Sequence, residues 1–254
     1  NSVVIPTVGF STNLARLLET PADEYSSLTG MELVAKKVKM LVAMAGHALN
    51  KDYCEYNVKW DIPAAKKVFE QWPTPIVISP FELGMAIEYP GASIANDFAW
   101  VEGYHPMVES YKAFDKMPFD RPTWDLTAVL YAVEGGSWFT VSEPCTIEVG
   151  EKGQTYFTPN PEGNVLILSV TEEQAAAINK RFQNASVRVF SADNNALAGS
   201  DANAYSESVC RLAREMGRVQ ASKPVVEADG EVDDTALVCA VGVGTGVSAD
   251  ASTT

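Results

Sequence analysis

The stretch CEYNVKWDIPAAKKVFEQ, residues 54–71, joins a polar pair to the start of a helix. Glu55 and Asn57 stand two residues apart, at the end of a loop or short strand, and therefore share a side. Asp61 is a candidate N-cap with a proline in the following turn, and an apolar stripe at helical spacing comes next: Ala64, Ala65, Val68 and Phe69. The pair can present a carboxylate and an amide to one ligand, or it can be a solvated turn before a buried helix.

Short apolar runs alternate with helical patterns along the rest of the chain. The predicted strands are 3–5, 40–44, 75–79 and 164–170, and the predicted helices are 14–18, 31–39, 123–133 and 171–182. Thr12 or Asn13 is the expected cap of the first helix. Thr123 is the expected cap of the third, whose packed face is predicted to be Ala128, Val129, Tyr131 and Ala132. Residues 145–149 and 154–158 alternate like a hairpin with Lys152 and Gly153 at the turn. We therefore expect an α/β fold with a mostly parallel central sheet flanked by helices, Rossmann-related, and a small β-hairpin region.

Residues 84–120 are irregular and rich in aromatic side chains. They form either helical packing with a long loop or a lid over a substrate. In a mostly parallel sheet a ligand sits at the carboxyl ends of the strands, and Thr7, Met44, Glu55 and Phe81 all fall near such ends.

Composition limits the classes of partner. The chain has 254 residues, 46% hydrophobic and 20% charged, as in an ordinary globular domain, and we expect one domain over 1–254. Its net charge of -14 argues against nucleic acid and anionic membranes, and suits a neutral or cationic small molecule or a carboxylate metal site. No apolar run is long enough for a membrane span, and the start does not resemble a signal peptide.

The four cysteines are scattered and form no C-x-x-C pair: Cys54, Cys145, Cys210 and Cys239. This spacing argues against a zinc cluster. One or two disulfides remain open, so the sequence predicts a soluble protein without deciding between a cytoplasmic and an exported one.

Four blocks, in this order, resemble the inosine–uridine nucleoside hydrolase family. VVIPTVGFSTNLARLL (3–18) is similar to its V-P-T-G-P-L-T-N strand and turn, and VKMLVAMAG (38–46) to its V-x-x-V-L-M-G-G strand. Residues 54–71 resemble E-F-N-x-x-x-D-P-x-A-A with Tyr56 in place of phenylalanine, and RPTWDLTAVLYAV (121–133) resembles H-D-P-x-A-V-A-Y-L. The resemblance implies a nucleoside hydrolase-like fold for a main body of residues 1–190.

The remaining segment, 191–254, carries an aspartate motif out of family order. PVVEADGEVDDTALVCAV (224–241) resembles the signature D-x-D-x-G-x-D-D-A, which the family has at its N-terminus. Asp229, Asp233 and Asp234 keep the D-x-x-x-D-D spacing, while Glu227 replaces an aspartate and the glycine is shifted to Gly230. Carboxylates at a strand end and a helix start suit a hard cation such as Ca²⁺, and a plain acidic turn is the alternative. The chain is either circularly permuted or recorded with its segments out of order.

The resemblance implies Ca²⁺-dependent hydrolysis of an N-glycosidic bond between ribose and a base. By position, Asp229, Asp234, the Thr7 carbonyl and Asp125 would hold the ion, and Asp229 would also take the proton of the attacking water. Asp233, Glu55 and Asn57 would bind ribose hydroxyls, with Met44 packed beside the sugar.

One residue departs from the family pattern. Trp124 stands before Asp125 where many members have histidine, and an indole cannot deliver a proton as imidazolium does. It can stack on the leaving base or line a pocket for another glycoside. His47 follows the 40–44 strand and could reach the pocket mouth, but both His47 and His105 are interpreted as surface or packing residues. The alternative function is therefore a sugar- or carbohydrate-binding protein with little hydrolase activity. The expected ligand is a nucleoside or sugar, and a homo-oligomer remains open.

Overall fold

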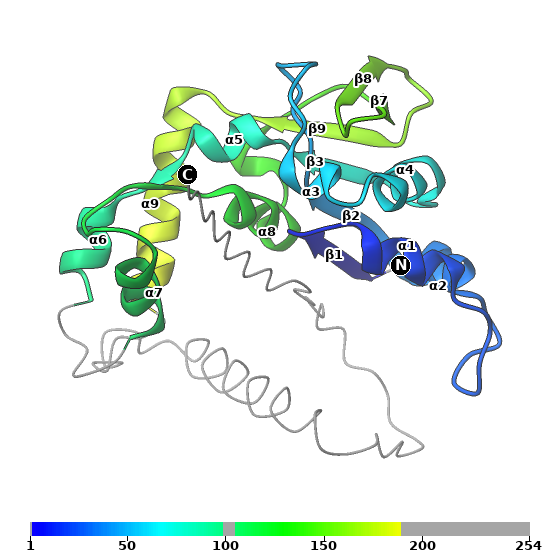
Figure 1. Cartoon of the computed structure of the whole chain (residues 1–254), viewed down its shortest axis with the longest axis horizontal. Coiled ribbons are helices and arrows are strands. Elements are labelled where there is room, and N and C mark those ends of the chain that lie inside the picture. Colours follow the sequence, from blue (N-terminus) through cyan, green and yellow to red (C-terminus); the bar gives the residue numbers. More distant parts are fainter. Residues whose placement is uncertain (1, 99–104, 189–254) are drawn as a thin grey trace, which may run out of the picture. The chain divides into compact units, whose positions relative to one another are not determined.

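The computed structural model describes residues 2–98 and 105–188 (Figure 1). Their contacts divide them into two compact units, which meet in sequence at Pro90/Gly91, Phe119/Asp120 and Lys180/Arg181. The first unit holds β1 (Val3–Thr7), α1 (Thr12–Glu19), α2 (Gly30–Lys37), β2 (Val38–Met44), α3 (Tyr56–Lys59), α4 (Ile62–Gln71), β3 (Ile76–Ser79), α5 (Phe81–Met85), β4 (Glu88–Tyr89), β5 (Arg121–Pro122), α8 (Trp124–Glu134), η1 (Gly136–Trp138), β6 (Thr140–Val141), β7 (Cys145–Val149), β8 (Thr155–Pro159) and β9 (Val165–Ser169). The second holds α6 (Gly91–Asn96) and α7 (Pro106–Phe114), and α9 (Glu172–Arg188) begins in the first unit and ends in the second.

The first unit is built on a sheet with the strand order β1-β2-β3-β9-β7-β8 (Figure 1). β1, β2, β3 and β9 are parallel neighbours, while β7 pairs antiparallel with β9 and β8, and β6 pairs antiparallel with β9. Helices connect the parallel strands, as such connections require. The predicted α/β class, with its mostly parallel sheet and small hairpin, is confirmed.

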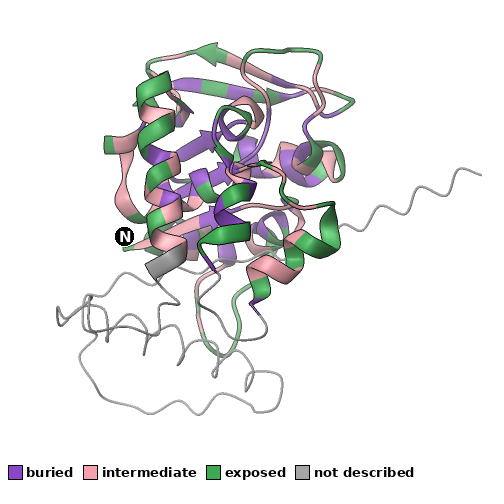
Figure 2. Ribbon diagram, turned by 90° about the vertical axis from the view of Figure 1, so that its left-hand side faces the viewer, coloured by how far each residue is buried: buried purple, intermediate pink, exposed green. Residues whose placement is uncertain are grey.

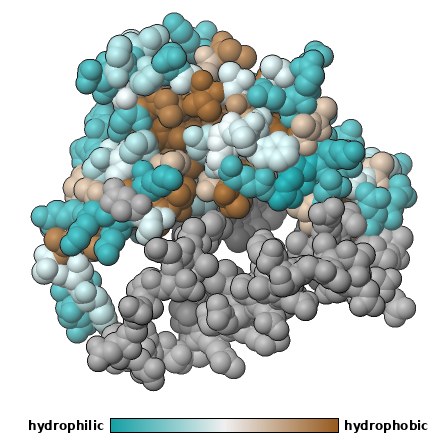
Figure 3. Space-filling model, turned by 180° about the vertical axis from the view of Figure 1, so that it is seen from behind, coloured by the Kyte–Doolittle hydropathy of each residue, from teal (hydrophilic) through white to brown (hydrophobic). Residues whose placement is uncertain are grey.

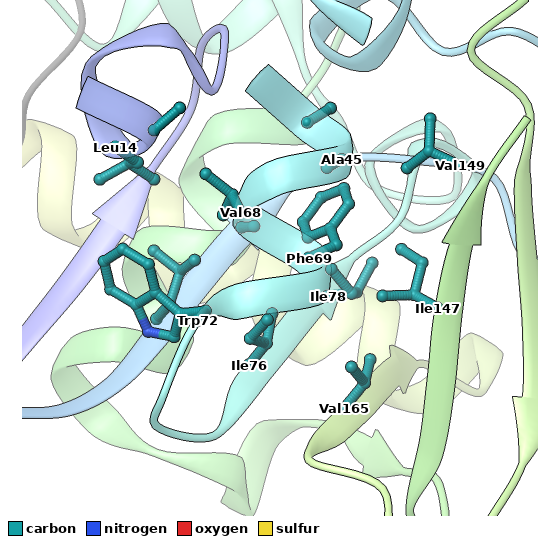
Figure 4. Close-up of a cluster of buried hydrophobic side chains, with 14 of the residues drawn as sticks. Leu14, Ala45, Val68, Phe69, Trp72, Ile76, Ile78, Ile147, Val149 and Val165 are labelled. Atoms are coloured by element: carbon teal, nitrogen blue, oxygen red, sulfur yellow. The ribbon is translucent and has the colours of Figure 1, made fainter. Parts of the chain in front are cut away.

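Alternating residues of the central strands are buried on both faces of this sheet, which explains their continuous apolar sequence. Ile76 and Ile78 point into a cluster with α1, α4 and β7 that includes Leu14, Val68, Phe69, Trp72 and Ile147 (Figure 4). Val42 and Val77 are equally buried but lie outside this cluster, and α8 contacts β1, β2 and β3. Figure 2 shows the buried residues concentrated in the strands and on the inner sides of the helices.

The start of α4 forms as the sequence predicts. Asp61 is its N-cap and accepts a hydrogen bond from Ala64 N at 3.2 Å, with a proline in the first turn. All four residues of the predicted stripe are buried, namely Ala64, Ala65, Val68 and Phe69. Tyr56–Lys59 before it form the short helix α3 rather than a strand end, because Glu55 caps them.

Several cap and boundary predictions are wrong. The N-cap of α1 is Ser11 rather than Thr12 or Asn13, and no side chain caps that helix. Thr123 is the N-cap residue of α8, but its hydroxyl donates to the Ile87 carbonyl instead of accepting from the helix. The buried face of α8 is Thr127, Ala128 and Leu130, so only Ala128 of the predicted packed residues is fully buried. α9 continues past residue 182, to Arg188.

Residues 84–120 are less irregular than predicted, since they contain part of α5 together with β4, α6 and α7. Within the second unit, Phe119 stacks on Tyr111 with ring centroids 5.0 Å apart and lies 5.8 Å from Phe114. Aromatic packing therefore accounts for part of the aromatic content of this region. A role as a substrate lid stays a prediction.

The aspartates of the tail, Asp229, Asp233 and Asp234, lie outside the described residues. Both sides of β2 are occupied, by β1 and β3, whereas the outer edge of β1 pairs with none of the described strands. The apolar residues Val225 and Val226 predict a tail strand beside the 3–5 or the 40–44 strand of the sheet. Its place beside β1 stays a prediction, and a place directly beside β2 is excluded. Among the described residues, none of the helices is both long and apolar enough to cross a bilayer. One face of the molecule shows apolar patches between hydrophilic side chains (Figure 3).

Candidate functional site

The predicted site residues of the main body lie around the carboxyl ends of β1, β2 and β3. Thr7 ends β1 and pairs in register with Ala43, next to Met44 at the end of β2. Trp124 begins α8, and its indole Nε1 donates to the Phe81 carbonyl just after β3, at 3.1 Å. Parallel strands present their carboxyl ends at one edge, where α/β proteins usually bind ligands.

Glu55 is buried and its carboxylate organises the turn around it. Oε1 accepts from Asn57 N at 2.9 Å, while Oε2 accepts from Gly46 N at 3.2 Å and Val58 N at 3.3 Å. Burial raises the pKa of the Glu55 carboxyl, and these backbone N–H groups oppose the rise. Because a carboxylate oxygen has two lone pairs, Oε1 keeps one acceptor position for a further hydroxyl.

Asn57 is tied to the end of β2. Its Nδ2 donates to the Met44 carbonyl at 3.0 Å and lies 3.1 Å from the Met44 sulfur. Since a carbonyl needs a donor, this contact assigns the amide orientation and leaves Oδ1 as the free acceptor. The structure thus brings Glu55, Asn57 and Met44 together, in two linked turns.

Thr7 and Asp125 are the described members of the predicted ion site. Thr7 is buried at the end of β1, whereas the Asp125 side chain is exposed in the first turn of α8. The surrounding protein desolvates the Asp125 carboxyl and raises its pKa, and the nearby Arg121 opposes this rise. A main-chain carbonyl and a carboxylate are donors that a hard cation such as Ca²⁺ takes, so these two residues fit the ion by chemistry.

The remaining predicted ligands belong to the undescribed tail. Within residues 2–98 and 105–188, no three histidine, cysteine, aspartate or glutamate side chains converge as a metal site would require. The convergence of Thr7, Asp125, Asp229 and Asp234 on one cation therefore stays a prediction.

Trp124 is held by packing on α5. Its ring stacks on Phe81 with centroids 5.5 Å apart at 27°, and its Nε1–H is used by the Phe81 carbonyl. Gly84 allows this approach, because an added Cβ would lie 2.2 Å from Trp124 Cδ1. The indole is half-buried, so one part of it is fixed in the fold and another part still meets solvent.

No sequence pattern connects His47 with Glu82, yet the structure places them in contact. His47 Nδ1 lies 3.1 Å from Glu82 Oε2, and the imidazole stacks on Phe81 with centroids 5.7 Å apart. Tyr53 packs against both rings. A glutamate directly after a strand end was the one available signal, but its partner lies 35 positions away in sequence (82 minus 47).

Three exposed rings also follow the same strand ends. Phe10 and Tyr56 lie 5.8 Å apart, and Tyr56 and Trp60 lie 5.7 Å apart, with the Lys59 ammonium 5.6 Å from the Tyr56 ring. Tyr56 comes between Glu55 and Asn57, so these rings flank the same turn. Large exposed aromatic side chains are often found near ligand sites.

Comparison with known proteins supports the family and the fold. The family model described as inosine-uridine preferring nucleoside hydrolase matches residues 1–198. No curated protein matches the sequence. Similar solved structures include a plant nucleoside hydrolase, at 17% identity and TM-score 0.52, covering 71% of this chain and 61% of that one. Another is an inosine-guanosine nucleoside hydrolase, at 17% identity and TM-score 0.50, covering 70% and 60%. The chain thus spans about three fifths of the length of these solved relatives, and the likeness concerns the fold.

Proposed function

Because the chain belongs to the inosine-uridine preferring nucleoside hydrolase family, we propose that it is a Ca²⁺-dependent hydrolase of N-glycosidic bonds in ribonucleosides or related N-ribosyl compounds. The observation that carries the proposal is the linked pair of turns at the end of β2. There Gly46 N bonds the Glu55 carboxylate and Met44 O accepts from Asn57, in front of the strand end that carries Thr7.

Sugar binding is the task of this pair of turns. Oδ1 of Asn57 and the open position on Oε1 of Glu55 are acceptors for two ribose hydroxyls, and Asp233 supplies a third. Backbone bonds hold both side chains in one orientation, so little side-chain entropy is lost when the sugar binds. Met44 packs against the sugar face.

The reaction also needs an activated water and stabilisation of a cationic sugar. Thr7, Asp125, Asp229 and Asp234 would hold the Ca²⁺ ion, which would supply the Lewis acidity that makes a bound water easier to deprotonate. Asp229 takes the proton as the water oxygen bonds to the anomeric carbon. The carboxylates of the site stabilise the positive charge that develops on the ribose ring in the transition state.

The test is release of free base from a nucleoside panel, measured by chromatography with and without added Ca²⁺. We expect release by the full chain with Ca²⁺, and a loss of at least 10²-fold in Asp125→Asn, on the order expected when a catalytic charge is removed. Glu151→Gln, an exposed carboxylate in the β7–β8 turn, is the control with the same change of charge. A full chain that releases no base from any nucleoside would contradict the proposal.

One observation favours the sugar-binding alternative. The Trp124 indole stacks on Phe81 and donates its Nε1–H to the Phe81 carbonyl, at the position where a hydrolase would need to deliver a proton to the leaving group. Calorimetry separates the two functions. A binding protein would retain ribose or nucleoside without releasing base, whereas a hydrolase would consume the nucleoside during the titration.

A further inference from the structure

The β7–β8 hairpin contacts both ends of the loop that follows β2, residues 46–54. Gln154 of the hairpin forms an isolated antiparallel bridge with Cys54, at the end of this loop. The next residue, Thr155, begins β8 and bonds His47, near the start of the loop. Two successive residues of the hairpin therefore hold the loop at both ends.

Thr155 is buried, and its hydroxyl bonds the backbone of the loop. Oγ1 accepts from His47 N at 3.0 Å and donates to His47 O at 3.4 Å, the second bond being the longer and weaker one. β2 ends at Met44, so the N–H of His47 takes its partner from a side chain rather than from the sheet. The hydroxyl thus fixes the loop just after it leaves the strand.

One peptide group, between Gly46 and His47, is held on both sides. Its N–H is the donor to Thr155, and its carbonyl accepts from Phe81 N at 2.9 Å. Gly46 has a φ of 73°, in the left-handed region that favours glycine. An added Cβ at Gly46 would lie 2.8 Å from Thr155 Oγ1, so the hydroxyl also lies against the Gly46 backbone. These contacts determine the direction of the Gly46 N–H, which donates to Glu55 Oε2 at 3.2 Å.

The Gly46 N–H connects the hairpin with the proposed ribose site. It is one of three backbone N–H groups that orient the buried Glu55 carboxylate. The same end of β2 bonds Asn57 through the Met44 carbonyl. A loop that left the strand in another direction would take the Gly46 N–H away from Glu55, and the carboxylate would lose one of the bonds that orient it.

We infer that Thr155 is a positioning residue of the ribose site. Through the Gly46–His47 peptide group, it keeps the Glu55 carboxylate oriented for the sugar. The inference rests on the proposed role of Glu55 and Asn57 in sugar binding. In the free protein the hydroxyl holds the loop in the direction that binds ribose, so the loop need not be ordered when the sugar arrives. If only about a tenth of the molecules held the loop in that direction, ribose would bind about tenfold more weakly.

The test measures ribose binding to the full chain with Ca²⁺ by calorimetry, together with kcat and KM for inosine. Thr155→Val keeps the branched shape and removes the hydroxyl, which leaves His47 N without its partner. We expect the ribose Kd and the inosine KM to rise about tenfold, which corresponds to about 1.4 kcal/mol. We expect kcat to change little, because a bound sugar itself orders the loop.

Two single variants are the controls. Thr155→Ser keeps a hydroxyl, so its ribose Kd should be close to that of the parent. Thr158→Val makes the same change as Thr155→Val on an exposed residue of β8, and it should behave as the parent. A rise in Kd that is equal in Thr155→Val and Thr155→Ser, or that Thr158→Val shares, would overturn the role of the hydroxyl.

A double variant tests the path through Glu55. Glu55→Gln alone should weaken ribose binding. Adding Thr155→Val to it should raise the Kd by a smaller factor than in the parent, because both changes disturb the bond of the Gly46 N–H. Equal factors in the two backgrounds would mean that Thr155 does not act through Glu55, and would overturn the inference.

Thermal unfolding of each variant separates positioning from a structural role. A lower unfolding temperature of Thr155→Val with unchanged Kd and KM would make Thr155 structural only, and would overturn the inference, as would a loss of kcat at unchanged KM. A parent chain that binds ribose but releases no base would contradict the hydrolase function, while the Kd comparison still decides the role of Thr155. A parent chain that binds neither ribose nor inosine would overturn the ribose site, and this inference with it.

Discussion

At the scale of single residues, Glu55 has two tasks that are usually separate. It caps α3 and ties Gly46 to that helix, and it is also a proposed ligand of the ribose hydroxyls. A buried carboxylate is costly unless it is hydrogen-bonded, and three backbone N–H groups meet this need here. Its structural task does not depend on its proposed binding task, so the two can be tested separately.

The pKa of Glu55 makes a prediction about stability. Burial raises the pKa of Glu55 in the folded state above its usual value near 4.5. The stabilisation of the folded state that this shift provides is therefore complete below about pH 4.5 and is lost as the pH rises through the raised pKa. Glutamine does not titrate. The unfolding free energy of the parent chain minus that of Glu55→Gln should therefore be larger at pH 5 than at pH 8. Urea unfolding at a series of pH values measures it, and a difference independent of pH would disprove the raised pKa.

Trp124 gives a second prediction at this scale. Stacking of its half-buried ring on a base or sugar contributes on the order of 1–3 kcal/mol, so Trp124→Ala should weaken ligand binding roughly ten- to a hundredfold and leave Ca²⁺ binding intact. Trp124→Phe keeps a ring to stack on Phe81 and should recover most of the affinity. Calorimetric titration of each variant with a nucleoside and with Ca²⁺ measures the two affinities. If Trp124→Ala binds the nucleoside as the parent does, Trp124 only packs α5 against α8.

At the scale of elements, the close approach of α5 to α8 determines where Asp125 lies. α5 follows β3, α8 begins at Trp124, and Gly84 lets the indole lie against the α5 backbone. The Trp124 ring then stacks on Phe81, which also packs on His47. One glycine therefore connects the proposed ion ligand on α8 with the histidine loop after β2.

Gly84→Ala tests this packing. Alanine favours a helix by about 1 kcal/mol over glycine, but overpacking costs about 1–3 kcal/mol and more against a backbone atom. The new Cβ would lie 2.6 Å from Trp124 Cα, so the clash should win and thermal unfolding should shift to lower temperature. Gly9→Ala is the control, because its Cβ would meet no atom within 4 Å. A stabilised Gly84→Ala would mean that α5 and α8 separate easily.

At the scale of the whole molecule, the proposed ion site joins the main body to the tail. Thr7 and Asp125 lie at the sheet edge, while Asp229 and Asp234 belong to residues beyond those described. The outer edge of β1 pairs with none of the described strands, so it offers a place for the predicted tail strand. A site shared in this way would couple ion binding to the stability of the entire fold.

Ca²⁺ should therefore raise the unfolding temperature of the full chain. At a hundredfold excess over its dissociation constant, an ion that binds only the folded state stabilises it by about 2.7 kcal/mol, or several degrees. Asp234→Asn should remove most of this shift, and Asp201→Asn, in the tail but outside the motif, should not. A calcium-dependent shift that is the same in all three chains would exclude the tail motif as the ion site.

The sequence by itself determined the parallel sheet, the hairpin and the buried stripe of α4, because period-2 and helical apolar patterns depend on neighbours close in the chain. Its family-like blocks also pointed to Glu55, Asn57, Met44 and Asp125. Only the tertiary structure decided that Glu55 bonds Gly46, that Trp124 packs on Phe81 and Gly84, and that His47 meets Glu82. These contacts join residues from different elements, and the folding of the sheet, rather than any local pattern, brings them within hydrogen-bonding or stacking distance.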